Sequence, residues 1–262
     1  MRAATGGGPV KVVVSAYPLA QMAQYIGGND VRVEDLAPPG AQPAGLRLTE
    51  AQLQTIARAP LLLDVGYGYQ PQVEAAPARR RLSLLPALTK RAHPYQFWLD
   101  PSLMFQAAPL VAAALARLDP AGRAQFANGA RDLQSVASSL ESDFQSNLSQ
   151  CGQSEFVTAD GAFHRMAVSY GLTEISVATV GVARAAALVA KGHIPVIFSE
   201  TGVGSGPVLQ VARATGVPVK VLDTLEVAPP SPGPTPESYF TAMERDLTTI
   251  EDALACDTSG SY

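Results

Sequence analysis

The sequence predicts an α/β protein of two lobes, each a mostly parallel sheet flanked by helices, with one long rigid helix joining the lobes. Short runs rich in β-branched residues alternate with helix-like segments in both halves of the chain, as in parallel sheets with crossover helices. A helical pattern without strands interrupts this alternation at 120–150. With 262 residues and 47% hydrophobic content, the chain is long enough to bury a core in two medium domains.

The strands and crossover helices follow in order. We expect strands in the first half at VKVVVS (10–15), VRVEDL (31–36) and LLLDV (61–65). In the second half we expect them at FVTA (156–159), ISVA (175–178), IPVIFS (194–199) and VPVKVLD (217–223). Helical spacing, often followed by a glycine that stops the helix, predicts helices at 18–26, 49–58, 162–170, 180–191 and 207–215.

The segment 120–150 predicts the long connecting helix. It has no proline after its first residue, and its apolar residues recur in helical register at Phe126, Leu133, Val136, Leu140, Phe144 and Leu148. The expected division is therefore a lobe at 9–119, the connecting helix at 120–150 and a second lobe at 151–262. A proline-rich loop from Ala228 precedes a closing amphipathic helix within 236–254.

Composition argues against several classes of function. A balance of 19 basic and 23 acidic residues gives no electrostatic reason to expect a nucleic-acid partner. No uninterrupted apolar run approaches the roughly 18 residues of a membrane span. We also expect no enzyme, because there is no GxSxG elbow and neither cysteine has a histidine nearby in sequence.

Four segments carry a resemblance to a known family: GAQPAGLRLT from Gly40, PYQFWLDP from Pro94, TADGAFHRMAVSYGL from Thr158 and VKVLDTL from Val219. Their order and spacing resemble the ligand-bearing segments of the solute-binding proteins that deliver zinc or manganese to ABC importers. The opening VVVSAYPLAQMAQYIGG and the closing SYFTAMERDL are similar to further landmarks of that family, so the resemblance spans nearly the whole chain.

The resemblance implies a metal-transport protein in the periplasm or lipid-anchored at the cell surface. Its expected partners are a metal ion and an ABC permease, and we expect a monomer. The start, MRAATGGGPVKVVVS, has no apolar signal core, which fits either a chain that follows a removed export signal or a cytosolic protein. The export that the resemblance implies favours the first, with the export signal absent from this sequence.

Residue by residue, the resemblance implies an altered metal site. The family's first histidine falls on Ala44, which cannot coordinate a metal, and its second falls on Gln96. The third and fourth ligands fall on Asp160 and Asp223. Gln96, Asp160 and Asp223 form an all-oxygen set, which favours hard ions such as manganese, calcium or magnesium and needs about six donors. The family implies manganese or zinc, and binding of no metal at all stays open.

Four other residues belong to the hypothesis. His93 lies three residues before Gln96, and His164 lies four residues after Asp160, so either could add a ligand or could have a surface or packing role. Glu200, which begins the glycine-rich turn ETGVGSG, is interpreted as an acidic residue at the rim of the site. Arg47 is a candidate base to compensate the two aspartates.

Cys151 and Cys256 are the only cysteines, and without CxxC spacing they are a poor metal signal. They are either two thiols or one disulfide, and the export that the resemblance implies favours the disulfide.

The expected function is capture of a divalent cation between two lobes for an importer. The alternative is a degenerate paralogue with the same fold that binds a non-metal ligand or a partner protein.

Overall fold

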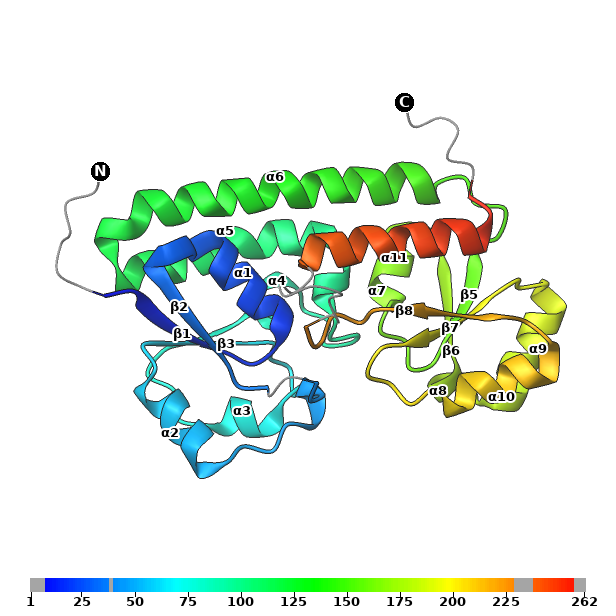
Figure 1. Ribbon diagram of the computed structural model, residues 1–262, viewed down its shortest axis with the longest axis horizontal. Coiled ribbons are helices and arrows are strands. Elements are labelled where there is room, and N and C mark those ends of the chain that lie inside the picture. Colours follow the sequence, from blue (N-terminus) through cyan, green and yellow to red (C-terminus); the bar gives the residue numbers. More distant parts are fainter. Residues whose placement is uncertain (1–7, 38–39, 229–237, 257–262) are drawn as a thin grey trace. The chain divides into compact units, whose positions relative to one another are not determined.

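The computed structural model describes residues 8–37, 40–228 and 238–256, shown as a ribbon in Figure 1. They form two compact units. The N-terminal unit comprises the described residues up to Ala92 together with Leu103–Val136, and the C-terminal unit comprises His93–Ser102 and the described residues from Ala137 onward. Each unit contains one four-stranded sheet flanked by helices, which confirms the predicted fold class. The division at 9–119, 120–150 and 151–262 stays a prediction.

The N-terminal sheet is parallel throughout. Its strands are β1 (Val10–Val14), β2 (Val31–Asp35), β3 (Leu61–Asp64) and β4 (Arg81–Ser83), in the order β2-β1-β3-β4. The short strand β4 was not predicted, because three residues give almost no periodic signal. It is held to β3 partly by the ion pair between Arg81 and the buried carboxylate of Asp64.

Helices cover this sheet because alternate strand residues point to opposite faces. On one face, Val13 and Leu62 pack with Ile56 and Val73, which come from the two helices below the sheet in Figure 1. Thr49 begins the first of these helices with a capping box, accepting a hydrogen bond from the backbone of Gln52. The unit's short elements are α1 (Tyr17–Gly27), η1 (Gly28–Asp30), η2 (Pro43–Gly45), α2 (Glu50–Arg58), α3 (Pro71–Ala75) and α4 (Leu84–Leu88).

Two long helices follow the first sheet in the chain. Helix α5 (Pro101–Leu118) was not predicted, whereas α6 (Arg123–Leu148) confirms the long helix expected at 120–150. A short connection containing η4 (Pro120–Gly122) joins them into an antiparallel pair. Pro109 has no backbone N–H to donate to the carbonyl of Phe105, and Gln134 Nε2 of α6 donates to that oxygen instead, at 3.3 Å.

Helix α5 corrects one expectation from the sequence. Over 18 residues its mean hydropathy is 1.3, so it is long and apolar enough for a membrane span, although 44% of it is buried within the protein. Met104, Ala107, Val111 and Leu115 recur at helical spacing and are buried. This pattern is typical of a helix that packs on a core.

The C-terminal sheet is also parallel, in the order β6-β5-β7-β8. Its strands are β5 (Glu155–Thr158), β6 (Thr173–Ser176), β7 (Ile197–Glu200) and β8 (Val219–Leu222). Strand β6 ends at Ser176, two residues before the end of the predicted run at 175–178, because Ser176 accepts a hydrogen bond from Thr179 N and begins a helix.

Both faces of this sheet are covered. Val157 and Ile197 pack on one face with Val189 and Val211 of two helices, and Phe156 and Phe198 meet edge to face on the other, with ring centroids 5.8 Å apart. The helical elements of the unit are η3 (Phe97–Leu99), α7 (His164–Ser169), α8 (Val177–Val180), α9 (Val182–Gly192), α10 (Gly206–Thr215) and α11 (Tyr239–Leu254).

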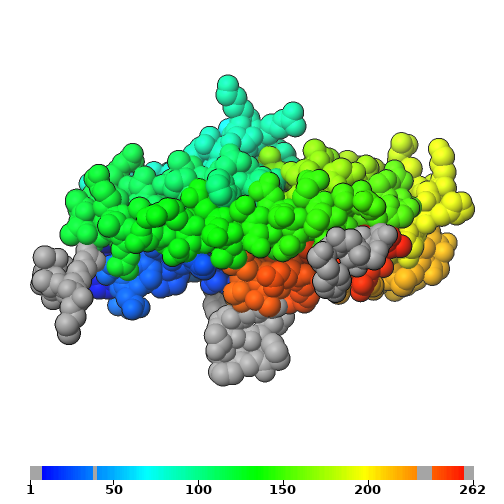
Figure 2. Space-filling view, turned by 90° about the horizontal axis from the view of Figure 1, so that it is seen from above, coloured from blue at the N-terminus to red at the C-terminus, as the bar shows by residue number. Residues whose placement is uncertain are grey.

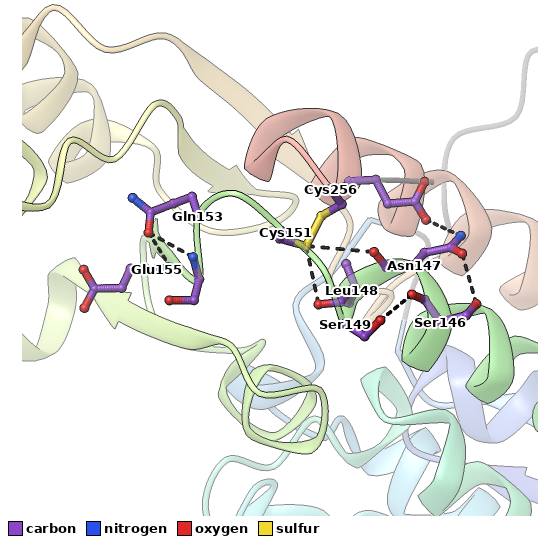
Figure 3. The surroundings of a disulfide bond; sticks show 10 residues. Ser146, Asn147, Leu148, Ser149, Cys151, Gln153, Glu155 and Cys256 are labelled. Atoms are coloured by element: carbon purple, nitrogen blue, oxygen red, sulfur yellow. Dashed lines mark hydrogen bonds between the residues drawn. A yellow bond between two sulfur atoms is a disulfide. The ribbon is translucent and has the colours of Figure 1, made fainter. Parts of the chain in front are cut away.

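A disulfide joins Cys151 to Cys256, which confirms the bonded alternative (Figure 3). It follows α6 at one end and α11 at the other. Asn147 of α6 donates a hydrogen bond to Glu251 of α11 at 2.7 Å beside it. The bond therefore fixes the end of α11 to the segment that leads into β5.

Candidate functional site

Three carboxylates lie at the same edge of the C-terminal sheet. Asp160 follows β5 by two residues, Glu200 is the last residue of β7, and Asp223 is the first residue after β8. Because the strands are parallel and adjacent in this order, their carboxyl ends lie at one edge. This edge is where open α/β sheets bind ligands. All predicted metal ligands, Gln96 included, belong to the C-terminal unit.

Glu200 shapes the turn that carries Asp160. Its Oε2 accepts hydrogen bonds from the backbone N–H groups of Ala159 at 2.7 Å and Asp160 at 2.9 Å. Its Oε1 is buried without a hydrogen-bond partner among the described residues. Burial raises the pKa of Glu200 to about 9, and the neighbouring charge of Asp160 adds to the rise. Burial therefore favours the protonated form of Glu200, and its two accepted hydrogen bonds make it a clamp on the turn.

Glu174 of β6 is a further acidic residue here, and the sequence analysis missed it. Its Oε1 accepts from Thr158 Oγ1 at 2.7 Å and from Phe163 N at 3.2 Å. Burial raises its pKa to about 7. The acid lies inside a strand, and nothing in the sequence distinguished it from an ordinary surface residue of a half-buried strand. With Glu200, it leaves Asp160 as the exposed carboxylate of this turn.

Asp223 is almost fully buried, with 3% of its surface exposed. Its Oδ1 accepts from Thr201 Oγ1 at 2.6 Å and from Leu225 N at 2.9 Å. Its Oδ2 pairs with Arg245 Nη2 of α11 at 3.3 Å. Both carboxylate oxygens thus have partners inside the protein. The base beside Asp223 is Arg245, a role that the sequence analysis had suggested for Arg47.

Gln96 lies beside the segment that follows Asp223. Its Nε2 donates to Glu226 Oε1 at 2.8 Å, and nearby Trp98 Nε1 donates to the carbonyl of Thr224 at 2.8 Å. The hydroxyl of Tyr239 donates to the carbonyl of Trp98. These bonds fix the chain around Gln96 against residues 224–226. With its nitrogen committed to Glu226, the amide has only Oε1 to offer a cation.

The remaining candidates are less closely tied to this edge. Ala44 is an exposed residue of η2 in the N-terminal unit and supplies no donor atom. His93 is exposed and its Nε2 lies 3.2 Å from the hydroxyl of Tyr95. His164, the first residue of α7, and His193 are exposed as well. Within the described ranges, no three His, Cys, Asp or Glu side chains are grouped so that they could hold a metal ion. The set of Gln96, Asp160 and Asp223 stays a prediction.

The donor set defines what this edge can do chemically. Of the predicted ligands, Asp160 and Asp223 would supply carboxylate oxygens, and Gln96 would supply one neutral amide oxygen. A hard cation suits such oxygens, although water or backbone atoms would have to complete its coordination. Zinc prefers imidazole and thiolate ligands, and none of these three residues carries either group.

The sequence matches the model of a family described as "Zinc-uptake complex component A periplasmic" over residues 12–253. Two relatives are the zinc-binding protein AdcA of Streptococcus pyogenes and the iron-binding protein YfeA of Yersinia pestis, each 24% identical. The alignments cover 97% of this chain and 57% of AdcA, and 92% of this chain and 85% of YfeA. The chain thus spans little more than half the length of AdcA.

Solved structures show the same fold. The laminin-binding protein Lmb of Streptococcus agalactiae has a TM-score of 0.84 at 20% identity, covering 94% of this chain and 99% of its own. The Zn(II)-bound ZnuA-like domain of AdcA from Streptococcus pneumoniae has a TM-score of 0.81 at 20% identity, with 94% and 99% covered.

Proposed function

The chain belongs to the family of periplasmic zinc-uptake component A, and on this premise we propose that it is the extracytoplasmic solute-binding protein of a metal-type ABC importer. It would capture a divalent cation through Gln96, Asp160 and Asp223 and present it to a membrane permease, without a chemical step. The disulfide between Cys151 and Cys256 supports an oxidising, extracytoplasmic location. Two relatives are named for zinc and iron, and the oxygen-rich donor set here favours a harder ion such as manganese.

One observation carries the proposal. Asp160 and Asp223 follow β5 and β8, whose carboxyl ends share one sheet edge, and the end of β7 between them bonds to both. Glu200 accepts from Asp160 N, and the next residue, Thr201, donates to Asp223 Oδ1. The two aspartates are thus tied to neighbouring points of one hydrogen-bonded network.

The test is a panel of zinc, manganese, calcium and magnesium added to chelator-treated protein and followed by thermal denaturation and calorimetry. A bound ion stabilises the folded state by RT ln(1 + [L]/Kd), so about 100-fold excess over Kd adds about 2.7 kcal/mol. Asp160→Asn and Asp223→Asn should reduce the stabilisation. Asp143→Asn is the matched control, because Asp143 is an exposed aspartate on α6. A response unchanged in both site variants would show that the cation binds elsewhere.

A second function is favoured by the partners that the donors already have. Both carboxylate oxygens of Asp223 already have partners within the protein, and Gln96 is held by Glu226 through its amide nitrogen, which leaves only Oε1 for a cation. This favours the alternative that the chain keeps the fold and binds a non-metal ligand or a partner protein. A flat response to all four ions would support it.

A further inference from the structure

A groove lies between α5 and α6 in the N-terminal unit, and it shares no residue with the site described above. Its volume is about 500 Å³, within the range of about 300–1,000 Å³ that is usual for small-molecule sites. All of its lining residues belong to these two helices. Figure 2 views the molecule from the side on which α6 lies open, in green.

The floor of the groove is apolar and built of small side chains. Ala113 and Ala116 of α5 face Ala127 and Ala130 of α6 across it. Methyl groups do not fill the space between two helices, and this explains the hollow. Its lining on α5 spans residues 109–117, about two turns or roughly 12 Å. Among the lining residues, Pro109 and Ala113 of α5 and Ala127 of α6 are exposed, so apolar surface remains in the groove that a ligand could cover.

The rim of the groove is basic. Arg117, Arg123 and Arg131 line it, and none of the described residues that line it is acidic. Arg117 and Arg123 are exposed, and their side chains form no hydrogen bond or ion pair with residues that the structure describes. Arg131, two turns along α6 from Arg123, donates to Asn128 Oδ1 and to the carbonyl of Ala127.

The position of Arg123 is unfavourable for the helix itself. Arg117 in the last turn of α5 complements the helix dipole, but Arg123 is the first residue of α6, where the dipole is positive and the first turn has no acid. The carboxylate in the connection, Asp119, accepts from Ala121 N at 3.1 Å and does not line the groove. The C-terminal end of α5 and the N-terminal end of α6 offset each other, and the two guanidinium groups place positive potential at one end of an apolar groove.

We propose that this groove binds a fatty acid, with its alkyl chain on the alanine floor and its carboxylate between Arg117 and Arg123. The alkyl chain matches the narrow apolar floor, and the carboxylate matches paired guanidinium groups, which bind it through charge-assisted hydrogen bonds. The site is independent of the metal-binding proposal.

The test is a calorimetric titration with dodecanoate below its micelle concentration, with dodecyltrimethylammonium as the probe of opposite charge. We expect saturable binding of dodecanoate and at least about tenfold weaker binding of the cationic probe. The double variant Arg117→Gln/Arg123→Gln and the groove-filling variant Ala127→Leu should each raise the Kd for dodecanoate about tenfold. Arg184→Gln, a change of the same charge at an exposed residue of α9, should leave it unchanged.

Three results would overturn the proposal. One is the absence of saturable dodecanoate binding by the wild-type protein. Another is equal affinity for both probes, which would indicate adsorption of alkyl chains without recognition of the carboxylate. The third result combines two observations. The wild-type protein and Ala127→Leu bind anionic phospholipid vesicles whereas the arginine variant does not, and Ala127→Leu binds dodecanoate as tightly as the wild type. That pattern would identify a membrane-facing charged surface in place of a chain-binding groove.

Discussion

Replacing Arg245 by glutamine should tighten cation binding while it destabilises the fold. A cation that binds Asp223 must displace the Arg245 guanidinium, which lies 3.3 Å from Oδ2. Because the arginine side chain is 45% exposed, the ion pair contributes about 1 kcal/mol at most. Its removal should therefore lower the Kd for Mn²⁺ by up to about fivefold. The free energy of unfolding without metal should fall by about 1 kcal/mol, because the buried Asp223 keeps only its bonds from Thr201 and Leu225.

The assay is a calorimetric titration of chelator-treated protein with Mn²⁺, together with denaturant unfolding of the same samples. Arg184→Gln removes the same charge from an exposed position on α9 and should change neither quantity. The reasoning is refuted if Arg245→Gln binds Mn²⁺ no more tightly than the wild type while Arg184→Gln behaves as expected. Equal tightening by both variants would also refute it, because the effect would then come from net charge.

Three further predictions concern stability. Replacing both Cys151 and Cys256 by serine should lower the free energy of unfolding by about 2–5 kcal/mol, because the disulfide joins residues 105 positions apart in the sequence. Denaturant unfolding with and without reductant measures the loss. Folding raises the pKa of Glu174 from 4.5 to about 7. Its contribution to the free energy of unfolding is therefore fully present below pH 4.5 and is lost as the pH rises through 7. Glu174→Gln should therefore gain stability over the wild type between pH 5 and pH 8, by up to about 3 kcal/mol, and an unchanged difference would contradict the assignment. Gly129→Ala should destabilise the protein despite the better helix propensity of alanine, because the added Cβ would lie 2.4 Å from the carbonyl oxygen of Ile26. Thermal denaturation measures the effect. A raised melting temperature would contradict the prediction, because it would show that Ile26 moves away from the Cβ at little cost.

The fold was largely predictable, because it follows from local patterns. Buried parallel strands are continuous apolar runs, and the apolar register from Phe126 to Leu148 is long enough to indicate α6. Helix α5 was missed because its many alanines and the internal Pro109 weaken the periodic signal. Only the structure shows that Gln134 provides the hydrogen bond that this proline cannot.

The site was predictable only in part. The segments that carry Asp160 and Asp223 could be found from their order along the chain. The partners of these side chains could not, because they depend on contacts between residues far apart in sequence. Arg245 reaches Asp223 from the last helix, and Glu226 reaches Gln96 across 130 positions. The raised pKa of Glu200 follows from its burial, which no local pattern reveals.

The bond between Cys151 and Cys256 closes the polypeptide into a covalent ring that contains all four strands of the second sheet. A protease that cuts one peptide bond inside this ring would open it without releasing a fragment. The two pieces would separate in a denaturing gel only after reduction. An exported protein with this ring would thus keep its second sheet and α11 in one covalent body after a single nick.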